Sequence, residues 1–173
     1  VFLDSLGVKI VHPTTDCEFS GNLPPDKKYT KDDKRDAADL YGVSKIKASL
    51  FIESEGKNTK IIRTSIIGHE LSSHVSLLDW FLSSEGEVSG YTDHYWNGVT
   101  TLFWAQSCQK IIESWDESPV ITQLGLDTSV TKYELLELIK KVYNKDIVVT
   151  KKSTGLLANK ALLSDGPVLD IES

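Results

Sequence analysis

The sequence has no apolar stretch near the length of about 20 residues that a helix needs to cross a bilayer. It also has no excess of positive charge, because 19 lysines and arginines stand against 25 aspartates and glutamates. Proteins that bind DNA or RNA non-specifically usually present a basic face. The basic stretch at residues 27–35 is interleaved with aspartates, which predicts a solvated loop of mixed charge. We therefore expect no membrane partner and no nucleic-acid partner.

Cysteine is scarce, and its spacing fits no metal site. Cys17 and Cys108 lie far apart and form no C-x-x-C pair, which argues against zinc. Two free thiols in a cytoplasmic protein are the default, although one disulfide between them stays open. The sequence shows no signal-peptide pattern. We expect a cytoplasmic protein without a metal. His12 and His69 are expected to be structural or to contact substrate, and His74 and His94 are too scattered to form a ligand cluster.

A glycine-rich phosphate loop is also missing, because neither G-x-G-x-x-G nor G-x-x-G-x-x-G occurs. Such a loop brings backbone amides and a helix N-terminus to the pyrophosphate of a dinucleotide. Tight dinucleotide binding therefore has no basis in these residues alone. Val1 to Leu6 read as the end of a helix, which favours a chain cut from a longer one. The alternatives are that another chain supplies the loop or that catalysis has been lost.

What the sequence does contain is an alternation of strand and helix patterns. Alternating strands and helices predict an α/β fold with a mostly parallel sheet. We expect part of a Rossmann-like doubly wound sheet in residues 1–70, and a smaller substrate-binding portion, interleaved with the sheet, in residues 71–173. After Lys151 no clear element is predicted. Strands are expected at 8–11, 59–63, 87–91, 120–124 and 146–150, and helices at 40–55, 75–82, 100–115 and from the capping box Thr131–Glu134.

Ligands of a doubly wound sheet bind at the carboxyl ends of its strands, where two polar motifs stand. Thr14 and Thr15 follow the first strand, and Tyr41 and Lys45 share one face of the long helix. A phenol has a pKa near ~10, and a nearby ammonium lowers it. Such a tyrosine can protonate a carbonyl oxygen, and a threonine hydroxyl can hydrogen-bond the same oxygen. Y-x-x-x-K alone occurs often by chance, but the order of motifs here favours a carbonyl-reducing site.

Several stretches, in this order, resemble the dTDP-4-dehydrorhamnose reductase family of extended short-chain dehydrogenases. They are TTDCEFSG (14–21), YTKDD (29–33), LYGVSK (40–45) and IIRTSIIGHE (61–70). GYTDHYWNGVTT (90–101) and SVTKYELLELIKKVYNKDI (129–147) resemble one branch of that family. The resemblance extends to about Leu162.

The resemblance implies roles for particular residues. Tyr41 would donate the proton, Lys45 would lower its pKa and hold the nicotinamide ribose, and Thr15 would orient the substrate carbonyl. The cofactor would be NADPH or NADH, and residues 90–99 would belong to the sugar-nucleotide pocket. The expected catalytic residues are Thr15, Tyr41 and Lys45; the expected cofactor-binding residues are Tyr41, Lys45, Thr64 and Ser65; and the expected substrate-binding residues are Thr15, Asp16, Tyr91 and Asn97.

Departures from the family's pattern bear on the substrate. Related dehydratases carry Thr-Asp-Glu, whereas this chain has Thr15-Asp16-Cys17 with the glutamate displaced to Glu18, so a reductase is favoured. The family usually has Arg at the position of Val43 and Glu at that of Ser49. Asn159-Lys160 stands where this branch often carries an acidic–arginine pair, and no role is assigned to it. Three neighbouring aromatic residues could stack on a base or belong to the core: Tyr91, Tyr95 and Trp96.

The first functional hypothesis is NAD(P)H-dependent reduction of a 4-keto-6-deoxy sugar nucleotide. The second is a non-catalytic interaction protein on the same fold, like the regulatory subunit of methionine adenosyltransferase. The third is a sugar-nucleotide epimerase or dehydratase. The expected partners are the sugar-nucleotide substrate and either a second copy, forming a homodimer, or a missing N-terminal half.

Overall fold

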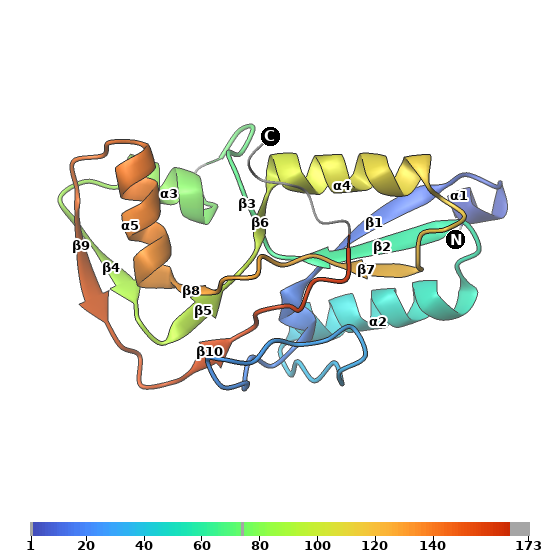
Figure 1. Ribbon diagram of the computed structural model, residues 1–173, viewed down its shortest axis with the longest axis horizontal. Coiled ribbons are helices and arrows are strands. Elements are labelled where there is room, and N and C mark those ends of the chain that lie inside the picture. Colours follow the sequence, from blue (N-terminus) through green and yellow to red (C-terminus); the bar gives the residue numbers. More distant parts are fainter. Residues whose placement is uncertain (1, 74, 167–173) are drawn as a thin grey trace.

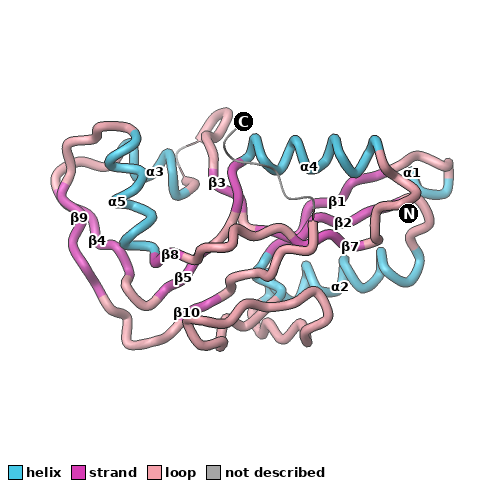
Figure 2. Tube along the Cα trace, viewed as in Figure 1, coloured by secondary structure: helices cyan, strands magenta, loops and turns pink. Residues whose placement is uncertain are grey.

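The structure is a computed structural model that describes residues 2–73 and 75–166. The molecule is elongated, with a sheet flanked by helices at one end and a smaller lobe at the other (Figure 1). Figure 2 shows that long loops connect the two ends. In the described part of the chain, no helix is both long and apolar enough to cross a membrane.

The larger lobe is built on a parallel sheet of three strands, in the order β1-β2-β7. α4 covers one face of this sheet and α2 the other (Figure 1). Both faces of a parallel sheet are normally covered in this way. The predicted α/β fold with a parallel sheet is therefore confirmed. The elements are α1 (Phe2–Ser5), β1 (Ile10–Thr15), the 3₁₀ helix η1 (Asp16–Glu18), α2 (Leu40–Glu55), β2 (Thr59–Thr64), α4 (Thr101–Glu113) and β7 (Ile121–Gln123).

Apolar side chains explain why α4 lies on the sheet. Ile111 and Trp115 are buried in one cluster with residues of the strands and the loops that follow them, and Trp104 and Cys108 pack against it. These four residues form the stripe that helical spacing predicts, and the stripe belongs to the core. The buried members of the cluster are Ile62, Val99, Ile111, Trp115 and Leu124.

The smaller lobe has its own core. β4 and β9 pair in parallel, and β5 lies between β10 and β8 in a second small sheet. Phe81 is fully buried here together with apolar residues of α5. The chain leaves the larger lobe through β3 and returns to it through β6, and these two strands pair in parallel. The elements are β3 (Ile66–Ile67), α3 (Leu77–Ser83), β4 (Glu87–Tyr91), β5 (His94–Trp96), β6 (Val99–Thr100), β8 (Val130–Thr131), α5 (Lys132–Val142), β9 (Val148–Lys152) and β10 (Ala158–Asn159).

Local signals define the helix starts well. The Asp39 side chain accepts a hydrogen bond from the Gly42 N–H at 2.9 Å and caps α2. The capping box predicted for Thr131 and Glu134 is present at the start of α5. Hydrogen bonds of this kind satisfy backbone donors that the first helical turn leaves unpaired, and they need only neighbouring residues.

Three expectations need correction. β1 begins at Ile10 and not at Val8, and it includes Thr14 and Thr15 because its pairing with β2 continues to Thr64. The expectation of no element after Lys151 is wrong, since β9 reaches Lys152 and β10 follows it. These residues are ordered by pairing with β4 and β5, which lie far away in the sequence.

The third correction concerns the basic stretch at residues 27–35. Lys27 and residues 31–34 are exposed, as a solvated loop predicts, but Tyr29 is buried and its ring stacks on Phe19 with centroids 4.2 Å apart. The Arg35 side chain is only 11% exposed and pairs with Glu18 and Glu53. The loop is therefore anchored to the sheet through the hydrogen bond from Gln123 to the Tyr29 carbonyl, and to α2 through the ion pair of Arg35 with Glu53. Its mixed-charge composition gives no sign of these contacts.

Candidate active site

Tyr41 and Lys45 lie at the start of α2, one helical turn apart. The Lys45 Nζ lies 5.5 Å from the centroid of the Tyr41 ring, so the two side chains share one face of the helix. Tyr41 is 54% exposed, which leaves its phenol accessible to a ligand.

Thr15 ends β1 and caps η1. Its Oγ1 accepts a hydrogen bond from the Cys17 N–H at 3.1 Å and donates one to Asp16 Oδ1 at 3.0 Å. Thr15 is half-buried. The hydroxyl is therefore held at the carboxyl end of the sheet, where a parallel sheet presents its ligand-binding residues.

Gly42 brings these two parts of the site together. A Cβ at this position would lie 2.5 Å from the Cys17 carbonyl oxygen and 2.4 Å from the Ala37 Cβ. The turn that follows Thr15 therefore rests directly against the first turn of the helix that carries Tyr41. The glycine within Y-G-x-S-K serves this close approach of two backbones.

Asp16 lies in a part of the site where lysines converge. Burial raises the pKa of Asp16, while the Thr15 hydroxyl and the charges of Lys160 and Lys132 lower it in part. Burial also lowers the pKa of the Lys132 ammonium, and the charge of Asp16 opposes this effect. The Lys132 Nζ lies 5.5 Å from the centroid of the Trp96 ring.

Sequence reasoning missed both lysines. Lys132 is the first residue of α5, where a positive charge opposes the helix dipole. That mismatch was a usable signal that Lys132 serves something other than the helix. Lys160 follows β10, and only tertiary packing brings it near Asp16.

A pocket of about 450 Å³ opens beside Lys132 in the smaller lobe. Tyr91, one of the predicted substrate-binding residues, lines it, and its ring lies 4.8 Å from that of His94. An aromatic wall of this kind suits a planar base. The lining residues are Leu77, Trp80, Glu87, Val88, Ser89, Tyr91, His94, Lys132 and Leu136. Lys132 thus stands between this pocket and Asp16.

The predicted cofactor-binding residues Thr64 and Ser65 lie at the end of β2. Thr64 is buried, and its Oγ1 donates to the Ser65 carbonyl at 3.2 Å. The Ser65 hydroxyl accepts a hydrogen bond from Trp96 Nε1 at 2.8 Å. Trp96 is itself a buried member of the core.

Asn97 lies in the interior and does not line the pocket. Its Nδ2 donates to the carbonyls of Leu126 and Leu162, both at 2.8 Å, and its Oδ1 accepts from the Leu162 N–H at 2.9 Å. Both amide hydrogens are therefore used to join distant segments. Asn97 therefore joins distant segments in this structure, and its expected substrate contact stays a prediction.

The histidines lie apart from one another. His69 bridges Asp79 and Tyr143 through its two ring nitrogens, at 2.7 and 2.9 Å. His12 is in β1, His94 is in β5, and His74 lies outside the described residues. Across residues 2–73 and 75–166, no group of three or more His, Cys, Asp or Glu side chains could hold a metal ion.

Comparison with known families gives the context for this geometry. The model of the family described as RmlD substrate binding domain matches residues 3–154. The chain belongs to this family. A search of curated proteins found no match.

Solved structures share the fold. A dTDP-4-dehydrorhamnose reductase from Bacillus anthracis, crystallised with NADP, superposes with a TM-score of 0.78 at 20% identity, over 94% of this chain and 59% of its own. The corresponding enzyme from Clostridium acetobutylicum gives 0.76 at 19% identity, over 94% and 56%. A dTDP-glucose 4,6-dehydratase from Bacillus anthracis, crystallised with NAD, gives 0.73 at 14% identity, over 95% and 56%.

Two facts follow from these superpositions. The fold is that of the Rossmann-like extended short-chain dehydrogenases, as the sequence predicts. The chain spans less than three fifths of the length of these three structures. Because reductases and dehydratases share the fold, the reaction must be argued from the site.

Proposed function

We propose that the protein containing this chain reduces the keto group of a 4-keto-6-deoxy sugar nucleotide with NADPH or NADH. The observation that carries the proposal is the contact at Gly42. It fixes the turn that bears Thr15 against the helix that bears Tyr41 and Lys45. These are the three groups that carbonyl reduction requires on the protein side.

Each residue has a distinct task. The Tyr41 phenol donates a proton to the carbonyl oxygen, and Lys45 lowers the cost of the phenolate that results. The Thr15 hydroxyl turns from Asp16 to the same oxygen and stabilises the charge that develops there. The nicotinamide cofactor supplies the hydride when it is bound.

The residues present fit only the nicotinamide end of such a cofactor. Lys45 and the accessible Tyr41 would hold its ribose, and Thr64 and Ser65 stand at the end of the neighbouring strand β2. Nothing in the sequence forms a phosphate loop. The cofactor phosphates would therefore be held by a further segment or by another chain. The NADP and NAD in the related crystal structures support this choice of cofactor.

The substrate would extend from the catalytic residues into the smaller lobe. We infer that the sugar lies near Thr15 and Asp16 and that the base lies in the pocket with Tyr91. Lys132 stands between these two positions and would face the phosphates. A lysine is a common point charge for phosphate binding.

Glu18 favours a reductase over a dehydratase. Elimination needs an acid and a base beside the threonine, but position 17 is a cysteine. The Glu18 carboxylate is fully buried and paired with Arg63, so it does not reach a substrate beside Thr15.

The direct test measures turnover of the protein made from its own gene. NADPH oxidation is followed by absorbance with dTDP-4-keto-6-deoxyglucose as substrate. Tyr41→Phe should lower kcat by about 10²-fold or more, because proton donation is lost, and should largely spare NADPH binding, because Lys45 still holds the ribose. Tyr143→Phe is the matched control, since the Tyr143 hydroxyl binds His69 and neither residue lines the pocket beside Lys132. Full activity in Tyr41→Phe would overturn the assignment.

The absent phosphate loop favours one alternative, a binding protein without catalytic activity. That protein would show no turnover and would form a stable complex with an unrelated enzyme. An epimerase or dehydratase would convert the sugar without net consumption of NADPH. Analysis of the product and of NADPH in the same reaction separates these three outcomes.

A further inference from the structure

Glu18 is a fully buried carboxylate that the proposed chemistry does not use. It is the last residue of η1, three positions after Thr15. Burying a carboxylate costs free energy unless hydrogen bonds and an opposite charge compensate. Its position close to the catalytic turn raises the question of what this costly group holds in place.

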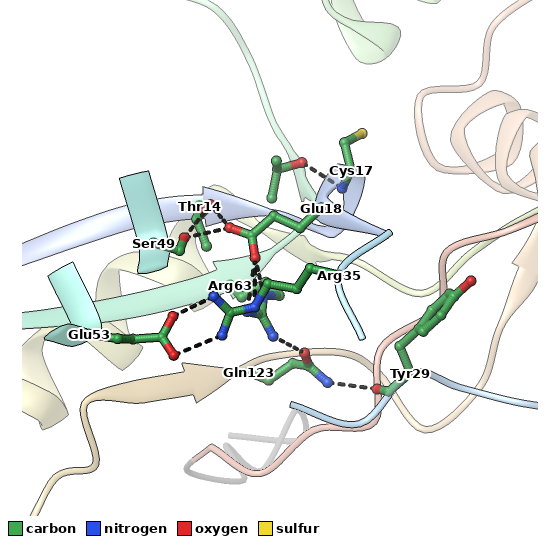
Figure 3. A network of polar contacts seen from close by, with 10 residues as sticks. Thr14, Cys17, Glu18, Tyr29, Arg35, Ser49, Glu53, Arg63 and Gln123 are labelled. Atoms are coloured by element: carbon green, nitrogen blue, oxygen red, sulfur yellow. Dashed lines mark hydrogen bonds and ion pairs between the residues drawn. The ribbon is translucent and has the colours of Figure 1, made fainter. Parts of the chain in front are cut away.

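The Glu18 carboxylate joins segments from four parts of the fold (Figure 3). Its Oε1 accepts hydrogen bonds from Thr14 Oγ1 at 2.6 Å and from Ser49 Oγ at 2.5 Å. Its Oε2 accepts one from Arg63 Nε at 3.0 Å. Arg35 Nε lies 3.5 Å from the same oxygen. The carboxylate thus contacts β1, α2, β2 and the loop that precedes α2.

Arg63 is a buried cation that depends on the charge of Glu18. Its guanidinium is fully buried, and its Nη2 lies 2.9 Å from Glu18 Oε2 without the alignment of a second hydrogen bond. Its Nη1 donates to Gln123 Oε1 at 3.1 Å. The charge of Glu18 is the main electrostatic compensation for this buried cation. A displaced Glu18 would leave Arg63 without its counter-charge, so the carboxylate is held firmly.

We propose that Glu18 is a positioning residue that sets the place of Thr15 relative to Tyr41 and Lys45. Ser49 lies on the helix that carries Tyr41 and Lys45, and Thr14 precedes Thr15 directly. One carboxylate oxygen accepts hydrogen bonds from both, so it ties the catalytic turn to the catalytic helix. The kinetic consequence rests on the proposed function, whereas the structural consequence can be measured without it.

The same contact suggests an exchange of residues. Because Ser49 Oγ lies 2.5 Å from the Glu18 carboxylate, a glutamate at position 49 could place its carboxylate near the same guanidinium. The double variant Glu18→Ser/Ser49→Glu keeps the composition and the buried charge. Glu18→Gln removes the charge alone. Glu53→Gln is the control, because Glu53 lies on the same helix as Ser49 and binds Arg35 of the preceding loop without contacting η1 in the network.

The first readout is hydrogen exchange of the protein made from its own gene. The Cys17 amide donates to Thr15 Oγ1 and the Phe19 amide to the Asp16 carbonyl, so both report on the turn. Glu18→Gln should raise their exchange rates by about 10-fold, the expected effect of losing hydrogen bonds to a charged group. The amides of α4 should keep their rates. In the double variant Glu18→Ser/Ser49→Glu and in Glu53→Gln, the hydrogen-exchange rates of these two amides should stay within about 3-fold of the wild type.

The second readout is kinetic. Glu18→Gln should lower kcat by about 10- to 100-fold with the KM for NADPH unchanged, because a small displacement of a catalytic group costs this much. The double variant Glu18→Ser/Ser49→Glu should recover most of the lost kcat. If the wild type shows no turnover, the proposed function fails while hydrogen exchange still decides the role of Glu18.

Three results would overturn the positioning role. The first is an unchanged exchange rate at Cys17 and Phe19 in Glu18→Gln. The second is an equal rise in α4, which would indicate a general loss of stability. The third is a raised hydrogen-exchange rate at Cys17 and Phe19 in the double variant Glu18→Ser/Ser49→Glu. If Glu18→Gln does not fold, the double variant Glu18→Ser/Ser49→Glu decides alone. A wild-type hydrogen-exchange rate at the Cys17 amide supports the proposal, and a raised rate or an unfolded chain overturns it.

Discussion

At the scale of single residues, the site depends on groups whose charges are costly to bury. Asp16 stands beside Thr15, and burial raises its pKa. Lys132 faces it from another lobe, and burial lowers the pKa of its ammonium. Strongly perturbed residues gather at functional sites more often than elsewhere. Asp16 adjoins Thr15, and Lys132 also lines the pocket of the smaller lobe.

The pKa of Asp16 predicts a stability effect with a definite sign. Because the pKa is higher in the folded state, the folded protein binds the proton more tightly, and stability falls as pH rises through the unfolded value of about 3.9 toward the folded one. Asp16→Asn removes this cost and keeps an acceptor for Thr15. We expect a higher Tm at pH 7 and a difference that shrinks as pH falls to about 4.

Thermal unfolding from pH 3 to pH 8 checks this expectation. Asp127→Asn, at an exposed position, is the control and should show no such trend. A lower Tm for Asp16→Asn at pH 7 would contradict the sign of the shift.

Lys132 gives a prediction about the substrate. Lys132→Met should raise the KM for the sugar nucleotide by about 10-fold or more, as expected for the loss of a charged hydrogen bond, and should leave NADPH affinity unchanged. Lys141→Met, on the exposed side of the same helix, is the matched control. Steady-state kinetics with each substrate varied in turn distinguish the two effects. An unchanged KM would remove Lys132 from the phosphate site.

Single residues also account for one departure from the family's sequence pattern. The resemblance to the family implies glutamate at the position of Ser49, and here Glu18 supplies a buried carboxylate whose Oε1 lies 2.5 Å from the Ser49 Oγ. In the sequence, position 49 is a serine and a glutamate stands at position 18. Only the packing of η1 against α2 reveals that the two positions contact the same buried network.

At the scale of elements, the decisive contact is that of η1 with the first turn of α2. Gly42→Ala should place a Cβ 2.5 Å from the Cys17 carbonyl, so that the turn or the helix must shift. We expect a loss of about 1–3 kcal/mol in stability, as for other overpacked sites. We also expect a fall in kcat, because Thr15 moves relative to Tyr41.

Denaturant unfolding and steady-state kinetics test this together. Ser54→Ala, at an exposed position of the same helix, should change neither quantity much. If Gly42→Ala keeps wild-type stability and kcat, the close approach of η1 and α2 does not matter for the site.

Element prediction succeeded where the signal is local. The main helices and half of the strands follow from periodicity, and both predicted features of helix starts, the Thr131 capping box and the Tyr41–Lys45 face, are present. The short strands β3, β5, β6, β8 and β10 escaped prediction. Each has only two or three residues, too few to show a period, and each is defined by a partner strand elsewhere.

At the scale of the whole molecule, β1 has a neighbour on one side only within the described residues. Parallel sheets in α/β proteins seldom leave a long edge uncovered. The chain also matches less than three fifths of the length of its structural relatives. The proposal that the phosphates of the cofactor are bound by a further segment or another chain rests on the absence of a glycine-rich loop from this sequence.

This proposal predicts a large difference in cofactor affinity. The 173-residue chain alone should show no saturable NADPH binding at micromolar concentrations, whereas the protein made from its own gene should bind it, because helix N-termini and loop amides supply much of the phosphate binding. Calorimetric titration of both samples, with circular dichroism to verify folding, measures this. Tight binding by the 173-residue chain would show that a different phosphate site exists within it. The cytoplasmic location and the homodimer stay predictions.

The sequence by itself determined the class of the fold and the chemistry available to it. Alternating apolar patterns fix strands and helices because they depend on neighbours a few residues apart, and the four-residue spacing of Tyr41 and Lys45 fixes their common face. Tertiary structure alone decided which distant groups meet. It paired Glu18 with Arg63, brought Lys132 and Lys160 toward Asp16, and directed the Asn97 amide into the interior. These contacts join segments dozens of residues apart, and their geometry follows from packing, which no periodicity in the chain records.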